Sequence, residues 1–428
     1  MLEGIFLSAA LAIGQPAGQP MPMPIPGGAP APHHVEAAPA APAAQPTIIW
    51  EQGTNGYTEV VAEEQARTKY LLERLTEDTF LGHRGIKIYG WTELSYNASS
   101  STRSNRPVTF NDEAGNFQLN QNWLGIAKEV DPTKKEFQLG FKTEAILPGT
   151  DARFTLIRGF LDEQLRNGRG GGPRHYPIDI YQFYTEAFLP TVGPEGTTVR
   201  VGRFATHCSY EVTQGVDTPF LSRSHLFQAN PFTHTGVWAI TPLSDELTIS
   251  NGAALGSDNF IDQTARLNYL GQLKWAPKDG KNTWIFNTVI TDPRFNVREA
   301  FAQYNVYNLQ LIRKMNDCLT YVMDTTYSHT YDVPGLGYAD WYGAAQYLFW
   351  KHTDKFQSQL RVELFNDVKG FRTGGEGLYT GVTYGWAWTP KDWLLVRPSV
   401  RYDHHNRVPI FEGSRDQFTM TMDMIVRW

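Results

Sequence analysis

The chain has 428 residues, a formal net charge of −6, 13% aromatic residues and only 19% charged residues. No stretch of about 20 apolar residues occurs, which excludes a helical membrane protein. The scattered Lys and Arg residues give no indication of a nucleic-acid partner. Cys208 and Cys318 form neither a metal-ligand spacing nor a disulfide framework.

The first part of the chain has the composition of a leader and a linker. Residues 1–18 contain a short apolar run followed by small residues, as in a secretory signal peptide, although basic residues are missing before the run. Residues 19–58 are rich in Pro, Ala and Gly and predict a disordered linker. Residues 59–84 contain the best helix candidate, a short amphipathic helix. We expect it to pack near the rim of the next domain, or to serve as a plug or a partner-binding arm.

Residues 85–428 predict strands joined by connections of two alternating kinds. Seven connections are short and polar, and eight are longer and more variable, so the chain forms about 16 strands with both ends on the side of the short turns. An even strand number, short periplasmic turns and long outer loops are typical of bacterial outer-membrane barrels. We therefore expect an all-β fold: a transmembrane antiparallel up-and-down β-barrel of about 16 strands, preceded by a disordered linker and one short helix, with both termini periplasmic.

The last twelve residues, 417–428, predict which face of a strand meets lipid. Side chains of a strand alternate between two faces, and here an apolar face opposes a polar one with Ile425 as the exception. An Arg or Lys on the lipid face costs about 2–4 kcal/mol at mid-bilayer, so the charged set must point inward. The same rule, applied to all strands, predicts the following pore-lining residues: Lys87, Glu93, Lys142, Glu144, Glu186, Arg361, Glu363, Arg397, Arg401, Asp403, Asp423 and Arg427.

One arginine conflicts with this rule. Arg203 shares the parity of Val199 and Val201, which would place it outside the barrel. We expect either that a bulge at Gly202 corrects the register or that Arg203 reaches the lipid headgroups.

Aromatic residues cluster where the two membrane interfaces should lie. Six of them lie beside the short turns or at the end of the chain: Trp275, Trp284, Trp350, Trp388, Trp393 and Trp428. Six others lie nearer the long loops and are candidates for an outer girdle: Tyr96, Tyr331, Tyr338, Trp341, Tyr379 and Tyr402.

The sequence also resembles a known family, the OmpL-like β-barrel porins (beta-barrel porin-2), over roughly residues 85–428. The resemblance rests on residues 141–154 (FKTEAILPGTDARF), 198–204 (TVRVGRF) and 230–238 (NPFTHTGVW), and on the closing strand. It implies passive diffusion of small solutes and insertion by the outer-membrane assembly machinery. The family usually ends on Phe. Trp428 keeps an aromatic residue at the end of this chain, and we expect it to be the assembly signal.

The third long connection, residues 208–233, corresponds in order to the loop that enters the lumen of general porins. By that analogy it would narrow the channel and present Glu211, Asp217, Arg223 and His225; otherwise it lies flat over the mouth. The second loop, residues 147–177, carries several arginines and would latch onto a neighbouring subunit, attract anions or simply be solvated.

We therefore expect an outer-membrane porin with a water-filled channel for small polar solutes and ions, because about 16 strands enclose an aqueous lumen. A substrate-specific channel for a sugar or an anion is the alternative. No Gly-x-Ser-x-Gly or His-Glu-x-x-His element is present, so we expect no enzyme, no catalytic or metal site and no cofactor. The expected partners are outer-membrane lipid, the assembly machinery, the solutes and, as a candidate assembly, two further copies in a homotrimer.

Overall fold

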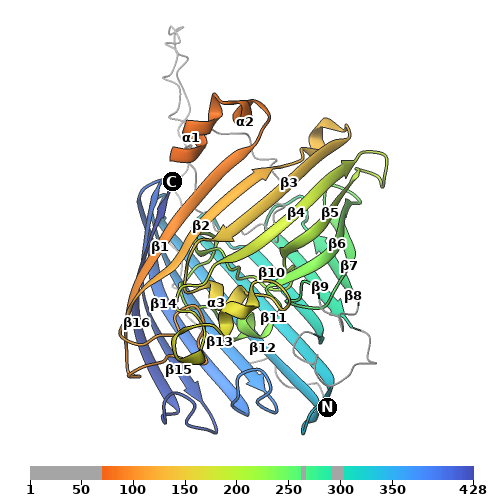
Figure 1. Ribbon diagram of the computed structural model, residues 1–428. Coiled ribbons are helices and arrows are strands. Elements are labelled where there is room, and N and C mark those ends of the chain that lie inside the picture. Colours follow the sequence, from red (N-terminus) through yellow and green to blue (C-terminus); the bar gives the residue numbers. More distant parts are fainter. Residues whose placement is uncertain (1–69, 262–266, 292–302) are drawn as a thin grey trace, which may run out of the picture. The chain divides into compact units, whose positions relative to one another are not determined.

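The computed structural model describes residues 70–261, 267–291 and 303–428. Sixteen antiparallel strands form a closed barrel in which each strand pairs with its neighbours in the chain and β16 pairs with β1 (Figure 1). This confirms the predicted fold class and strand number. The first eight strands are β1 Lys87–Ser99, β2 Phe117–Lys128, β3 Gln138–Ile146, β4 Asp179–Leu189, β5 Thr197–Ala205, β6 Thr233–Pro242, β7 Leu247–Ala254 and β8 Asn268–Trp275. The others are β9 Asn282–Ile290, β10 Asn305–Lys314, β11 Leu319–Val333, β12 Gly337–Thr353, β13 Phe356–Asp367, β14 Gly377–Lys391, β15 Leu394–His405 and β16 Asp416–Arg427.

Two short helices, α1 Leu71–Glu77 and α2 Phe80–His83, precede the barrel where one helix over 59–84 was predicted. Residues 59–69 lie outside the described residues. Helix α1 packs against β1, and the Tyr70 hydroxyl accepts a hydrogen bond of 2.9 Å from Arg427. The helical segment therefore lies at the rim of the barrel, as one of the two alternatives predicted. No helix within the described ranges has the length and apolarity needed to span a membrane.

Alternating burial along the strands confirms the predicted parity. In β16, Phe418, Met420 and Met422 are about half-exposed, while Gln417, Thr419 and Asp423 are buried. Ile425, the apolar exception on the polar face, is fully buried inside the barrel beside Trp91 and Leu395.

The aromatic girdles are only partly as predicted. On the side of the short turns, the four most exposed of the predicted tryptophans face outward: Trp275, Trp350, Trp388 and Trp393. On the loop side, Tyr96, Tyr331, Tyr338 and Tyr402 are also exposed. Trp341 and Tyr379 were assigned wrongly to the outer girdle. Both are fully buried in a cluster inside the barrel, because each belongs to the inward register of its strand.

Arg203 follows neither of the two expectations. The pairing of β5 with β4 and with β6 is continuous through Gly202, so no bulge shifts the register. The guanidinium is fully buried; it forms an ion pair of 2.8 Å with Asp179 and donates to the carbonyl of Thr155 in the second loop. A loop of the same chain thus covers this charge and removes the need for contact with lipid or headgroups.

The second loop, residues 147–178, folds back onto its own chain. Phe160 packs against Phe183 of β4 and Phe260 of the fourth loop, with ring centroids 5.4 and 4.8 Å apart. Backbone hydrogen bonds join Arg158 to Asp258 and Phe260. Within the described residues the loop is therefore engaged in its own subunit.

Lysine at an outward position tests this register. Val362 in the middle of β13 is 40% exposed on the outer face. We expect Val362→Lys to lower the free energy of unfolding in liposomes by about 2–4 kcal/mol, because it places an ammonium group in hydrocarbon. Gln272→Lys is the control, since Gln272 points into the barrel. Urea titration of both variants decides: equal losses would contradict the assigned register.

Candidate functional site

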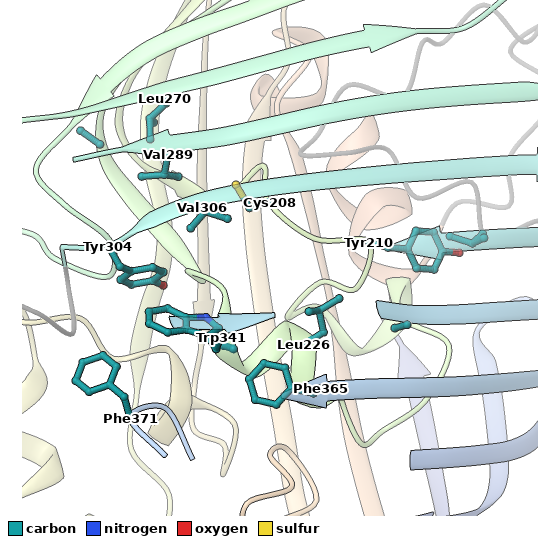
Figure 2. Packing of buried hydrophobic residues seen from close by; sticks show 14 of the residues in the cluster. Cys208, Tyr210, Leu226, Leu270, Val289, Tyr304, Val306, Trp341, Phe365 and Phe371 are labelled. Atoms are coloured by element: carbon teal, nitrogen blue, oxygen red, sulfur yellow. The ribbon is translucent and has the colours of Figure 1, made fainter. Parts of the chain in front are cut away.

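The third loop, residues 206–232, lies inside the barrel and packs on its inner wall. Its short helix α4 (His225–Ala229) contacts β12 and β13. Ser224 begins this helix, because its hydroxyl accepts a hydrogen bond of 3.0 Å from the Phe227 amide. Most side chains of the loop are buried, including Tyr210 and Leu226, which join the apolar cluster shown in Figure 2.

An arginine of β15 holds the first part of this loop. Arg397 forms ion pairs of 2.9 Å with Glu93 of β1 and 2.6 Å with Asp423 of β16. The same guanidinium donates hydrogen bonds to the carbonyls of Gly215 and Thr218 in the loop. Because the planar guanidinium has five donors in a fixed arrangement, one side chain can pair with two carboxylates and the loop backbone together.

Arg361 and Arg401 repeat this arrangement at other points of the loop. Arg361 of β13 pairs with Glu211 at 2.6 Å and donates to the Ser222 carbonyl at 2.8 Å. Arg401 of β15 pairs with Asp403 at 2.7 Å and donates to the Arg223 carbonyl at 2.8 Å. Each guanidinium therefore joins a carboxylate to the backbone of the loop.

The helix start is bound to the same wall through acids. The amide of His225 donates to Glu363 at 2.7 Å, and the His225 ring lies 3.0 Å from Asp403. These bonds come from β13 and β15, the strands that also carry the three arginines. Gln121 of β2 and Asp324 of β11 are also bonded to the loop, so strands at several places around the inner wall hold it.

Arg223 stabilises the loop from within. Its guanidinium donates to four loop carbonyls, those of Val212, Thr213, Phe220 and Leu221. Arg223 was predicted to face the channel, but its side chain is fully buried. Its hydrogen bonds therefore stabilise the fold of the loop. Of the four residues predicted to line the constriction, Asp217 is the exposed one.

On the neighbouring part of the wall, polar side chains of β9, β10 and β11 support the beginning of the loop. Asp324 of β11 accepts hydrogen bonds from the Ser209 hydroxyl and the Tyr210 amide, at 3.1 and 2.9 Å. It also accepts from Asn308 of β10, which in turn accepts from Asn287 of β9. None of these three residues was among those predicted to line the pore, although polar side chains with inward parity in otherwise apolar strands indicate such a row.

The remaining predicted pore-lining residues lie on β1, β3, β4 and at the rim. Glu144 accepts a hydrogen bond of 2.5 Å from the Tyr89 hydroxyl, and Glu186 pairs with Arg200 at 3.2 Å. Lys142 shares the inward parity of Glu144 and is partly buried. Lys87 is exposed and pairs with Glu129, whereas Arg427 binds Tyr70 at the rim.

The charges of the wall are arranged as neighbours of opposite sign rather than as two opposed walls. Glu93, Asp423 and Arg397 lie on three adjacent strands, β1, β16 and β15. Each of these buried carboxylates therefore has a cation beside it. The main effect of these ion pairs is structural, because their arginines also bind the third loop and determine its position.

A cavity of about 480 Å³ opens between the long loops. Its lining comes from the first, second, third, seventh and eighth loops: Arg106, Pro107, Thr109, Arg153, Phe154, Gln228, Phe232, Thr373 and Ile410. The third loop contributes Gln228 and Phe232 to it, so this cavity lies directly against the loop that enters the barrel. In the described parts of the chain, no group of three His, Cys, Asp or Glu side chains is arranged to hold a metal ion.

A closed 16-stranded barrel with an apolar outer face and an inserted loop defines an outer-membrane channel. Residues 85–428 match the family described as "Putative beta-barrel porin-2, OmpL-like", and the chain belongs to this family. It is therefore an outer-membrane porin, a channel for passive diffusion. No curated protein sequence matches the chain.

Solved porin structures share this fold at low sequence identity. The outer-membrane channel DcaP of Acinetobacter baumannii superposes with a TM-score of 0.53 at 10% identity, over 80% of this chain and 96% of that one. An anion-selective porin from Comamonas acidovorans gives 0.55 at 10% identity, over 80% and 99%. The trimer form of in-vitro folded OmpT from Vibrio cholerae gives 0.50 at 12% identity, over 80% and 99%.

Removing one guanidinium tests the attachment of the loop. Arg397→Gln leaves Glu93 and Asp423 buried without their cation, and we expect a loss of stability of about 3–5 kcal/mol. We also expect a larger single-channel conductance, because the loop segment around Gly215 loses its hydrogen bonds to the wall.

Arg407→Gln is the matched control, since Arg407 forms an exposed ion pair with Glu376. Such pairs contribute at most about 1 kcal/mol, and conductance should stay unchanged. The attachment would be disproved if Arg397→Gln kept the conductance and stability of the control.

A carboxylate of the eighth loop binds the backbone of the first loop. The Glu412 carboxylate accepts hydrogen bonds from the backbone amides of Thr102, Arg103 and Ser104, at 2.8, 3.1 and 2.9 Å. These bonds favour the charged form and lower the pKa of Glu412 below its usual 4.5.

The contact should therefore be fully present above pH 4.5 and be lost as the pH falls through the lowered pKa of Glu412. We expect Glu412→Gln to lower, at neutral pH, the protection of the amides of residues 102–104 relative to their intrinsic exchange rates, as acid does in the natural protein. Unchanged exchange in this variant would show that the carboxylate does not hold the first loop.

Proposed function

We propose that the third loop forms the constriction of the channel and that the porin passes small polar solutes and ions around it. The observation that carries this proposal is the attachment of the loop to the inner wall by Arg361, Arg397 and Arg401. A loop held inside the barrel by buried ion pairs reduces the open cross-section permanently, and width together with fixed charge determines what passes.

The predicted pore-lining residues then divide into two groups with different roles. Residues of β13, β15, β16 and β1 act as anchors of the loop: Glu93, Arg361, Glu363, Arg397, Arg401, Asp403 and Asp423. Lys87, Lys142, Glu144 and Glu186 on β1, β3 and β4, with Arg427 at the rim, line the solute path on the side of the short turns. Asp217 contributes the exposed charge of the constriction, while Glu211, Arg223 and His225 hold its shape.

The surroundings of the barrel follow from the same proposal. The apolar outer face contacts outer-membrane lipid, and both termini lie in the periplasm because the short turns do. The C-terminal strand with Trp428 is the signal for the assembly machinery. The chain assembles into a homotrimer, which the trimer form of the similar OmpT structure supports. The family and the fold are those of a channel, and we propose no catalytic activity.

A substrate-specific channel is the second candidate, favoured by the cavity between the loops. Phe154 and Phe232 offer ring faces, and the buried oxygens of Thr109 and Gln228 have no hydrogen-bond partner within the described structure. A site of this kind suits a small hydroxylated solute such as a sugar. It predicts that current through the channel falls and saturates as one sugar is added, whereas a general pore shows no saturation.

Charge reversal in the third loop tests the proposed constriction. We expect Asp217→Lys to shift the zero-current potential in a salt gradient towards anion selectivity, because the exposed charge lies at the narrowest point. Asp354→Lys, at an exposed turn between β12 and β13, is the matched control and should leave selectivity unchanged. Equal shifts in planar bilayers, or none, would place the constriction elsewhere.

A further inference from the structure

We infer that the outer face of β6–β9, centred on Asn251, is the surface through which one copy of this chain binds a second copy. The inference rests on the proposed homo-oligomer and assigns its interface. Three features of this face carry the inference: an amide without a hydrogen bond in the described chain, the two shortest strands of the described barrel, and small residues on either side of the amide.

Asn251 places an amide in the middle of the apolar belt. It lies in the centre of β7 with outward parity, between Ile249 and Ala253, and is exposed. Leu247, four residues nearer the turn, pairs with Trp275, which marks the interface on that side. Hydrocarbon offers the amide neither donor nor acceptor, so an exposed amide at this depth is unfavourable unless another protein covers it.

Three other outward amides of the described strands are bonded within the chain. The Tyr321 hydroxyl donates to Gln346 at 3.0 Å, and Asn366 donates to the Tyr342 hydroxyl at 2.9 Å. Asn122 is bonded to Thr92 and to a loop carbonyl. Within the described ranges the side chain of Asn251 has no such bond. The chain thus pairs these three amides and leaves this one available.

The strands of this face are too short for the apolar band of a bilayer. Strands β7 and β8 have 8 residues each and β9 has 9, whereas β11, β12 and β14 have 15, 17 and 15. At about 3.3 Å per residue and a tilt of about 40°, eight residues rise roughly 20 Å, less than the apolar band of about 25 Å. Covering the short side with protein removes this mismatch with lipid.

The residues paired with Asn251 on both sides are small, although the Tyr269 ring lies against one of them. These residues are Ala239 on β6 and Gly271 on β8. Small residues let two backbones approach closely, which brings the Asn251 amide within reach of a partner's polar groups. A second copy is the partner with matching chemistry, because its own face carries an amide that both donates and accepts.

The first experiment compares tryptophan substitutions in protein extracted with a mild detergent. Ala239→Trp and Asn251→Trp, which lipid tolerates but close packing does not, should convert the oligomer to monomers in native mass spectrometry. Ala98→Trp, on the exposed face of β1, should leave the oligomer intact. An oligomer that survives both substitutions, or a natural protein that is monomeric, overturns the inference.

A second experiment does not depend on tolerance of tryptophan. Tyr269 and Tyr384 are similarly exposed, at 48% and 42%, but Tyr384 lies on the far side of the barrel in β14. Each is replaced by p-benzoylphenylalanine and irradiated in native outer membranes. We expect adducts of two chains from position 269 and lipid adducts from position 384. Lipid adducts alone from position 269, or adducts to a different protein, contradict a second copy as the occupant.

Conductance of the same samples separates this inference from the proposed function. The monomeric tryptophan variants should retain the conductance of a single barrel. If they do, and photo-crosslinks between copies form at position 269, both proposals hold. If the natural protein is oligomeric through this face but does not conduct, the channel proposal fails while the interface stands.

Discussion

The ion pairs between the inner wall and the third loop are the interaction on which the site depends. Each of Arg361, Arg397 and Arg401 joins at least one carboxylate to a backbone carbonyl of the loop, and all three are buried. Removing a charge from water is costly, and here the cost is offset by a carboxylate and by loop carbonyls beside each guanidinium. The wall therefore specifies a single position for the loop, which an apolar contact surface would specify less strictly.

The barrel itself follows from a simpler constraint. In hydrocarbon every backbone amide and carbonyl must pair within the protein, and only a closed sheet achieves this with strands. Alternation then separates a lipid face from an inner face. Because the inner face here carries both charged side chains and a large apolar cluster, the third loop packs on it much as a segment packs in a protein core (Figure 2).

The sequence revealed most of the barrel because the relevant signals are local. Alternation in β16 and the order of short and long connections require only neighbouring residues, and both were sufficient for the strand number and the inward set. Arg203 shows where local information ends, since its burial depends on the second loop and on Asp179, 24 residues away. Trp341 and Tyr379 were misplaced for the same reason, because proximity to a loop does not reveal the face of a strand.

The sequence predicted which residues face the inside of the barrel, but not that many of them bind the third loop. Glu93, Arg397 and Asp423 had the correct parity, yet their partners come from strands that meet when the barrel closes and from a loop far away in the sequence. Amide hydrogen exchange of the third loop in lipid tests the account most directly. The amides of Tyr210, Ser224 and His225, bound to Asp324, Glu211 and Glu363, should exchange as slowly as strand amides. Exchange as fast as that of an open surface loop would show that the loop is not held inside the barrel.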